Sequence, residues 1–333
     1  MKALEARCFR PQAMPAIDQV PGEDRPFWSV MIPCYNSAAL LGATLESVLA
    51  QDPGPDLMQI EVVDDASTLD DPGEAVRRTG GDRVGYFRQP RNVGASANFT
   101  TCVRRSLGRW VHILHSDDLV RPGFYDRYRA RIEACPDVLM VGARTLAVDA
   151  EAHHLALTEP VATEGGYLLD PAFTVAAANP LRCVSVVVAR MAYEQGGGFH
   201  PGLRHANDWE MWTRVASRGP VGWVDEPLGL HRMHDDSDTN RLHRSTAYVD
   251  DCLKAADAIA GHFDGPTRVR ALRAARKSVC EYALTVGAEM LERGELRLAA
   301  ANAVRAVRID QSVEVRVRAS RLIFRAITKR TGR

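Results

Sequence analysis

Short apolar runs alternate with helical patterns in the first 120 residues, and this rhythm constrains the fold more than any other feature. Runs rich in strand-forming residues occupy 28–33, 58–63, 83–87 and 109–114. Between them, apolar residues recur at helical spacing in 40–49 and at about 95–107. This alternation predicts an α/β fold in which helices cover both faces of one sheet.

Three of these strands end in polar clusters. The clusters are Cys34-Tyr-Asn36, Asp64-Asp-Ala-Ser67 and His115-Ser-Asp-Asp118. Sheets of this class bind ligands beyond the C-terminal ends of their strands. Paired carboxylates repel unless water, a donor group or a cation compensates them, and a hard divalent cation prefers oxygen ligands. Each pair also has a structural interpretation, as an Asx cap or as a helix N-cap ahead of Pro122.

The pattern divides the chain into three parts. Residues 1–26 hold four prolines and no apolar periodicity, which predicts an irregular N-terminal arm. Residues 27–245 carry the alternating pattern, with a further strand expected at 183–189. From 246 to 333 the apolar stripes have helical spacing, which predicts a C-terminal helical accessory bundle ending in a basic tail.

Composition excludes several classes of protein. The formal net charge is zero, so we expect no nucleic-acid partner. The seven cysteines are scattered without CxxC spacing, which is typical of reduced, buried thiols and argues against structural zinc. No run approaches the ~20 apolar residues of a membrane span, and the N-terminus lacks the apolar segment of a signal peptide. We therefore expect a cytoplasmic protein.

The C-terminal tail has two interpretations. The last 21 residues contain seven Lys and Arg residues interleaved with Val313, Val317, Phe324 and Ile327. The tail is either a solvated helix packed on the bundle or a basic amphipathic helix lying on an anionic membrane surface. The second interpretation would make the protein peripheral on the inner face of the plasma membrane. The sequence does not indicate an oligomeric state.

Taken together and in order, the motifs resemble those of family 2 glycosyltransferases. The segments are Ser29-Val-Met-Ile-Pro33 with Tyr35-Asn36, Val63-Asp-Asp-Ala-Ser-Thr68, Arg91-Asn-Val-Gly-Ala-Ser-Ala-Asn98, Ser116-Asp-Asp118, Gly197-Gly-Phe199, Asn207-Asp208 and Arg232-Met-His234. The resemblance covers about residues 27–240. It implies a GT-A fold, with a mixed sheet flanked by helices. It also implies an inverting enzyme that moves a sugar from a nucleoside-diphosphate sugar to a hydroxyl of a glycan, lipid-linked or other acceptor, assisted by Mn²⁺ or Mg²⁺. If the tail binds a membrane, we expect a lipid-linked or envelope glycan as the acceptor.

The resemblance further implies which residues bind the donor. Pro33, Tyr35 and Asp65 would line the nucleoside pocket, with Asn36 next to them and Asp65 accepting a hydrogen bond from the base. The segment from Asn92 to Asn98 would close over the nucleotide.

Metal, diphosphate and base are assigned in the same way. Asp117 would lie near the ribose and Asp118 would hold the metal, although these two roles can be exchanged. His234, with Arg232, would close over the diphosphate or complete the metal shell. Asp208 would be the catalytic base.

Residues around Asp208 offer alternatives. His205 is a rival base, and Glu210 is better explained as a first-turn carboxylate favoured by the helix dipole. Trp212 is expected in the core, while Trp209 remains open between core packing and stacking on a sugar.

Three positions depart from the family pattern. His115 stands where an Asp commonly opens the metal motif, Ala66 replaces a usual Gly or Asn, and Asn207 stands where a Glu often precedes the base. Other functions fit less well. A nicotinamide dehydrogenase would need a GxGxxG turn after the first strand, and a nucleotidyltransferase would need a Gly-rich basic loop there. A non-catalytic scaffold that binds a nucleotide or glycan remains an alternative.

Overall fold

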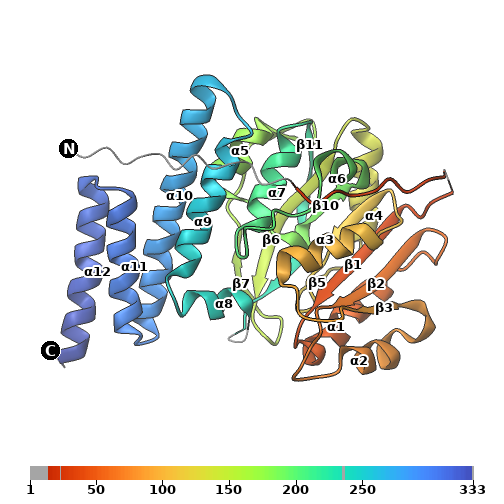
Figure 1. Ribbon diagram of the computed structural model, residues 1–333, viewed down its shortest axis with the longest axis horizontal. Helices are drawn as coiled ribbons and strands as arrows, with labels where there is room; N and C mark the ends of the chain where they lie inside the picture. Colours follow the sequence, from red (N-terminus) through yellow and green to blue (C-terminus); the bar gives the residue numbers. More distant parts are fainter. Residues whose placement is uncertain (1–13, 23, 235–236, 332–333) are drawn as a thin grey trace.

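The computed structural model describes residues 14–22, 24–234 and 237–331. In these residues the strands form one mixed sheet in the order β3-β2-β1-β4-β10-β6-β11-β9-β8, with β5 paired to β11 and β7 to β6 (Figure 1). The strands are β1 (Trp28–Cys34), β2 (Met58–Asp64), β3 (Gly85–Arg88), β4 (Trp110–Ile113), β5 (Leu119–Val120), β6 (Met140–Val148), β7 (His154–Leu157), β8 (Thr163–Glu164), β9 (Tyr167–Leu168), β10 (Val186–Ala189) and β11 (Val221–Arg232).

Helices cover both faces of this sheet and then continue alone to the C-terminus. They are α1 (Ala38–Leu49), α2 (Pro72–Thr79), α3 (Ala95–Arg105), α4 (Phe124–Ala134), α5 (Pro171–Ala178), α6 (Arg190–Gly196), α7 (Asn207–Ala216), α8 (Asp238–His243), α9 (Ala247–Ala260), α10 (Gly265–Glu292), α11 (Leu296–Ile309) and α12 (Val313–Thr331). Short 3-10 turns lie at Gly81–Arg83 and Cys183–Ser185.

Strand β1 serves two hydrophobic cores because its side chains alternate between the faces of the sheet. Val30 and Ile32 pack on one face with Leu41 of α1. Met31 packs on the other face with Phe99 of α3. The expected α/β architecture, with helices on both faces and a helical C-terminal part, is therefore confirmed.

The predicted strands are present with shifted bounds, but two long strands were not predicted. The expected strand at 183–189 is shorter, because residues 183–185 form a 3-10 turn. Strands β6 and β11 pair in parallel, with a register shift between Val224 and Gly229. Pro227 lies within that shift, where a residue without an N–H can be accommodated in a strand. The proline and the glycines of β11 had concealed the strand pattern.

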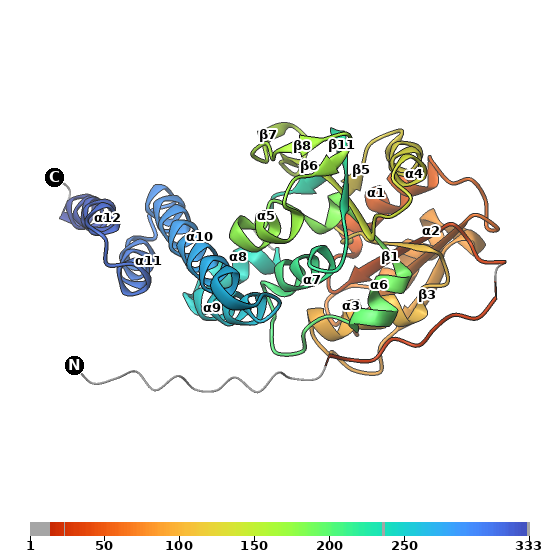
Figure 2. The same ribbon diagram turned by 90° about the horizontal axis from the view of Figure 1, so that it is seen from above.

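The C-terminal helices share a core with the sheet domain. One continuous hydrophobic cluster includes Met31 of β1, Trp212 of α7, Val249 of α9 and Ala326 of α12. In Figures 1 and 2, α10, α11 and α12 stand side by side, with α12 farthest from the sheet. None of the helices in the described residues has both the length and the apolar character needed to cross a membrane.

The described part of the N-terminal segment has no regular secondary structure. Residues 14–22 and 24–26 form no helix or strand, and residues 1–13 lie outside the description. The arm is attached by hydrogen bonds such as that from Gly198 N to Pro15 O, 2.8 Å long. The six cysteines in the described residues are free and buried, while Cys8 lies outside them.

Candidate functional site

Parallel pairing brings the polar clusters to one edge of the sheet. Cys34 at the end of β1 is in register with Asp64 of β2, and β1 also pairs with β4. The hydroxyl oxygens of Ser37 and Ser116, which follow β1 and β4, lie 2.6 Å apart. The segments that contain Tyr35, Asp65 and Asp118 are therefore neighbours in space.

Asp64 and Asp65 have different surroundings. Asp64 is fully buried and accepts hydrogen bonds from Tyr86 Oη at 2.8 Å and Arg88 Nη1 at 2.5 Å, so it supports the loop. Asp65 accepts from the backbone N–H groups of Val93 at 2.7 Å and Gly94 at 2.9 Å. Burial raises the pKa of the Asp65 carboxyl, and these two hydrogen bonds partly offset that effect. Asp65 thus ties the end of β2 to the loop ahead of α3.

The three asparagines assigned to the donor site are oriented differently. Asn36 uses its side-chain oxygen to accept from the backbone N–H of Thr68 at 2.7 Å and of Leu69 at 3.1 Å. Asn98 is buried, and its amide donates to Val63 O at 2.9 Å. Asn92 is exposed. Asn92 also donates from its amide to Asp65 O at 3.3 Å, so all three contact neighbouring backbone, and Asn92 is the most exposed of them.

The two donor-site residues at the end of β1 also differ. Pro33 is buried within the strand, whereas the Tyr35 ring is exposed just beyond it. An exposed aromatic ring beside a polar strand end is available for stacking on a base.

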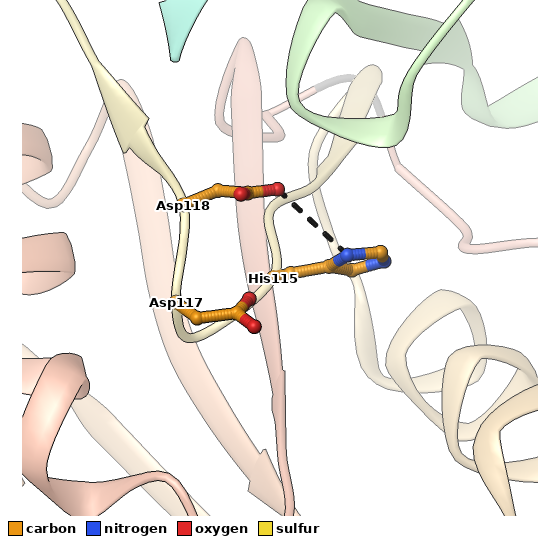
Figure 3. Close-up of side chains that lie close together, drawn as sticks. All are labelled: His115, Asp117 and Asp118. Carbon is orange, nitrogen blue, oxygen red and sulfur yellow. Dashed lines mark ion pairs between the residues drawn. The ribbon is translucent and has the colours of Figure 1, made fainter. Parts of the chain in front are cut away.

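The acidic motif after β4 forms a compact group of possible metal ligands. One ligand atom each from His115, Asp117 and Asp118 lies within 4.8 Å of the others, and the three side chains project from one turn (Figure 3). His115 Nδ1 is 3.8 Å from Asp118 Oδ2, while its Nε2 is buried without a partner in the described residues. Two carboxylates and an imidazole suit a divalent cation such as Mn²⁺ or Mg²⁺.

The end of β11 completes this group from the opposite direction. Asp118 Oδ1 accepts from the Arg232 backbone N–H at 3.0 Å and lies 3.1 Å from His231 Nδ1. His234 Nε2 is 2.9 Å from Asp117 Oδ2. Burial alone would raise the pKa of the Asp117 carboxyl, but the hydrogen bond from His234 and the neighbouring imidazoles lower it. Burial alone would lower the pKa of His231, and Asp118 raises it above the usual value.

Arg232 has a charged side chain in an unusual position. The residue is 5% exposed, and its Nε has no hydrogen-bond partner in the described part of the chain. A buried charge is costly unless an opposite charge compensates it. The guanidinium is therefore suited to an anionic ligand beside the acidic group.

Asp208 lies in the first turn of α7, as expected. Its Oδ1 accepts from its neighbour Trp209 N at 2.6 Å and from Asn179 Nδ2 at 3.5 Å, and it is half-buried. Burial raises the pKa of the Cys183 thiol well above its usual range, and the charges of Asp208 and Asp118 raise it further. Asp118, which precedes Cys183 in the sequence, and Asp208, which follows it, therefore both lie near this thiol.

The match to a family model decides the identity. Residues 29–158 match the model described as glycosyl transferase family 2. This part of the chain is a glycosyltransferase family 2 domain.

Relatives of this family 2 glycosyltransferase support the assignment. The succinoglycan biosynthesis protein ExoO of Rhizobium meliloti is 35% identical over 119 residues, which are 36% of this chain and 31% of that protein. The first four curated relatives are uncharacterized glycosyltransferases of Rickettsia species, and this chain matches 66%, 29%, 36% and 70% of their lengths. The matched part thus spans less than two thirds of several relatives.

Solved structures of similar fold align with almost the whole of this chain. S. aureus TarS 1–349 in complex with UDP-GlcNAc has a TM-score of 0.62 at 15% identity, with 92% of each chain covered. The mannosyltransferase PcManGT from Pyrobaculum calidifontis, in complex with GDP-Man and Mn²⁺, has a TM-score of 0.52 at 18% identity, covering 96% of this chain and 90% of that one. The expected GT-A fold is confirmed.

Two alternatives near Asp208 are decided by packing in this family 2 glycosyltransferase. Glu210 is fully buried and pairs with Arg214, with two N–O distances of 3.0 Å, and with His262 Nε2 at 2.8 Å, so it is not available as a base. Trp209 and Trp212 both lie in the core.

The structure shows the surroundings of each residue that departs from the family pattern. Ala66 adopts a left-handed backbone with φ of 58°, the conformation that favours the Gly or Asn found more often there. Asn207 is buried and donates to Ser96 Oγ at 2.8 Å, which ties α7 to α3. His115 joins the two aspartates as a possible ligand, and His231 contacts Asp118. The motif comparison treated His115 only as a departure, and it missed His231 because β11 was not predicted.

Proposed function

We propose that this chain transfers a sugar from a nucleoside-diphosphate sugar to an acceptor hydroxyl with inversion at the anomeric carbon. The observation that carries the proposal is the placement of acidic groups. Asp117 and Asp118 form one group at the strand ends, and Asp208 is a separate carboxylate at the start of α7. Donor activation and acceptor deprotonation need such separate groups.

The donor side would hold a divalent cation. Asp117, Asp118 and His234 are the proposed ligands, and His115 is a further candidate in the same group. Mn²⁺ accompanies GDP-Man in the PcManGT complex, which supports a cation with a nucleotide sugar here. A bound Mn²⁺ or Mg²⁺ would act as a Lewis acid that stabilises negative charge on the leaving diphosphate.

The protein's own cation on this side is Arg232. Its buried guanidinium, whose Nε has no hydrogen-bond partner in the described residues, would bind the diphosphate. The exposed Tyr35 and Asn92 would contact the nucleoside, with Asp65 accepting from the base through a remaining lone pair. Pro33, Asn36 and Asn98 would shape that pocket through the strand and loops.

Asp208 would be the general base. Its carboxylate would accept the proton of the acceptor hydroxyl while that oxygen attacks the anomeric carbon. The bond from the anomeric carbon to the phosphate oxygen breaks in the same displacement, so the nucleoside diphosphate leaves and the configuration inverts.

Two substitutions test this division of roles. We expect Asp118→Ala to abolish Mn²⁺-dependent binding of the donor, measured by calorimetry. We expect Asp208→Asn to bind donor nearly as the wild type does, while turnover falls by about 10²–10⁴-fold because the base is lost. Equal loss of binding and turnover in Asp208→Asn would contradict the assignment of the base. Absence of any metal-dependent release of nucleoside diphosphate from the wild type would instead favour a non-catalytic scaffold.

The relatives bear on which nucleotide and which acceptor this chain uses. TarS was solved with UDP-GlcNAc and PcManGT with GDP-Man, so relatives of this fold accept different nucleosides. The name of ExoO concerns succinoglycan biosynthesis, which supports a glycan acceptor. Thermal-shift screening of nucleoside-diphosphate sugars with Mn²⁺ would identify the donor, since a ligand that binds the folded state raises Tm.

We also propose that α12 contacts an anionic membrane surface. One face of α12 packs on the bundle through Val315, Ala319, Leu322 and Ala326. The opposite face exposes Val313, Val317, Phe324 and Ile327 by 43–78%, flanked by Arg316, Arg321 and Arg325. Exposed apolar residues beside arginines are typical of helices that lie in a lipid interface.

Vesicle sedimentation tests this contact. The wild type should bind vesicles that contain phosphatidylglycerol and should not bind vesicles of phosphatidylcholine alone. Phe324→Glu should abolish this binding, whereas Val269→Glu, on an exposed position of α10, should retain it. Equal binding of both variants would contradict the proposed role of α12.

A further inference from the structure

The helix that carries Asp208 begins without a side-chain cap of its own. Ala206 occupies the N-cap position of α7, and no side-chain cap hydrogen bond is present. Backbone N–H groups at the start of a helix have no acceptor within that helix. The segment leading into α7 therefore depends on acceptors from elsewhere in the chain.

Asp251 of α9 supplies these acceptors. Its Oδ2 accepts from the backbone N–H of His205 at 2.7 Å and of Ala206 at 3.0 Å. The N–H of Arg204 lies 3.1 and 3.2 Å from the two carboxylate oxygens. One carboxylate thus holds three consecutive N–H groups immediately ahead of Asp208. Bonds from a charged acceptor are stronger than neutral ones and fix the backbone accordingly.

Two further contacts with the C-terminal part of the chain lie on either side of Asp208 in the sequence. Tyr282 of α10 places its hydroxyl 3.2 Å from His205 Nε2. His262, which follows α9, contacts Glu210 at 2.8 Å. The base assigned to Asp208 therefore lies between residues that the C-terminal helices hold on both sides. In Figure 1, α9 stands between α7 and α10.

We infer that α9 and α10 form part of the frame of the active site, and that Asp251 is a positioning residue for Asp208. This inference rests on the proposed role of Asp208 as base. A displacement of about 1 Å in a reacting group can lower a rate about 10²-fold. Asp251 has no hydrogen bond to the donor-side residues at the ends of β1, β2, β4 and β11 among those described. Its loss therefore affects the rate of transfer and leaves donor binding intact.

The test compares two neighbouring aspartates of α9. Asp251→Ala should lower kcat by about 10–100-fold, with the KM and the Kd for the donor unchanged. Asp250→Ala is the matched control, because Asp250 is exposed and pairs with Arg305 of α11 instead of the segment ahead of α7. Its kcat should stay within about twofold of the wild type, since exposed ion pairs contribute little. Asp251→Asn retains one oxygen acceptor and should lie between the two.

The outcomes separate this inference from the proposed function. Unchanged kcat in Asp251→Ala would overturn the positioning role, even if Asp208→Asn is inactive and the proposed base stands. Parallel loss of donor binding and kcat in Asp251→Ala would also overturn it, because Asp251 would then support the domain as a whole. Should Asp251→Ala not fold, Asp251→Asn carries the same comparison. Full turnover in Asp208→Asn would instead refute the proposed base itself.

Discussion

Ala66 provides a sharp test of the donor loop, because its backbone lies in the left-handed region with φ of 58°. A residue with a Cβ atom costs about 1–2 kcal/mol in this conformation relative to the right-handed one. Glycine avoids that cost but loses more chain entropy on folding, by about 0.5–1 kcal/mol. The difference predicts that Ala66→Gly raises the free energy of unfolding by about 0.5–1 kcal/mol. Ala66 is half-buried, so removing its methyl group leaves little cavity.

Urea denaturation of the two variants Ala66→Gly and Ala97→Gly measures this effect with its control. Ala97 is exposed in helix α3, where glycine costs about 1 kcal/mol. The same substitution should therefore stabilise at one site and destabilise at the other. Donor affinity should be unchanged in Ala66→Gly, because the acceptors and donors around Asp65 are retained. A loss of stability in Ala66→Gly as large as that in Ala97→Gly would refute the reasoning.

Three other predictions concern the core, the donor and the sheet. Burial alone would raise the pKa of Glu210, but the hydrogen bond from His262 and nearby positive charges lower it from 4.5 to about 2. A lowered pKa stabilises the fold above pH 4.5, by about 3 kcal/mol, and this contribution is lost as the pH falls toward 2. The free energy of unfolding of Glu210→Gln should therefore lack this pH dependence in denaturation experiments. A pH profile like that of the wild type in this variant would contradict the prediction. Arg232→Gln should weaken binding of a nucleoside diphosphate by about 10–100-fold, since it removes charged hydrogen bonds, and should leave binding of the nucleoside unchanged. Calorimetry measures both affinities. Equal weakening of both would exclude a contact between Arg232 and the diphosphate. Gly108→Ala should lower the free energy of unfolding by about 3 kcal/mol, because its Cβ would lie 2.5 Å from the backbone of β1. Gly42→Ala is the control in the same denaturation assay and should be tolerated, since its Cβ would lie 3.6 Å from the nearest atom. Similar stability of the two variants would contradict this prediction.

The position of the proposed donor residues could be predicted from the sequence because the relevant information is local. The strand at 58–64 and the two aspartates at its end are adjacent in the chain, so periodicity locates them together. Parallel pairing then predicts that Asp65 and Asp118 meet at one edge, since the carboxyl ends of parallel strands share an edge. His231 was not accessible in this way, because Pro227 interrupts the pattern of β11 and the register shift that accommodates it is visible only in the sheet.

The boundary expected at 245 illustrates what periodicity cannot measure. The pattern changes there from mixed to purely helical, and this describes local structure correctly. It carries no information on where the helices pack, and α9 and α10 pack into the same core as β1 and α7. Asp251 cannot be distinguished in sequence from its exposed neighbour Asp250, although Asp251 binds the backbone ahead of Asp208 and Asp250 pairs with Arg305 of α11. The proposed acceptor side, around Asp208, is thus built from long-range contacts, whereas the proposed donor side is built from sequence motifs. Substitutions in the C-terminal helices, which carry no motif, should therefore lower turnover more than they lower the affinity for the donor.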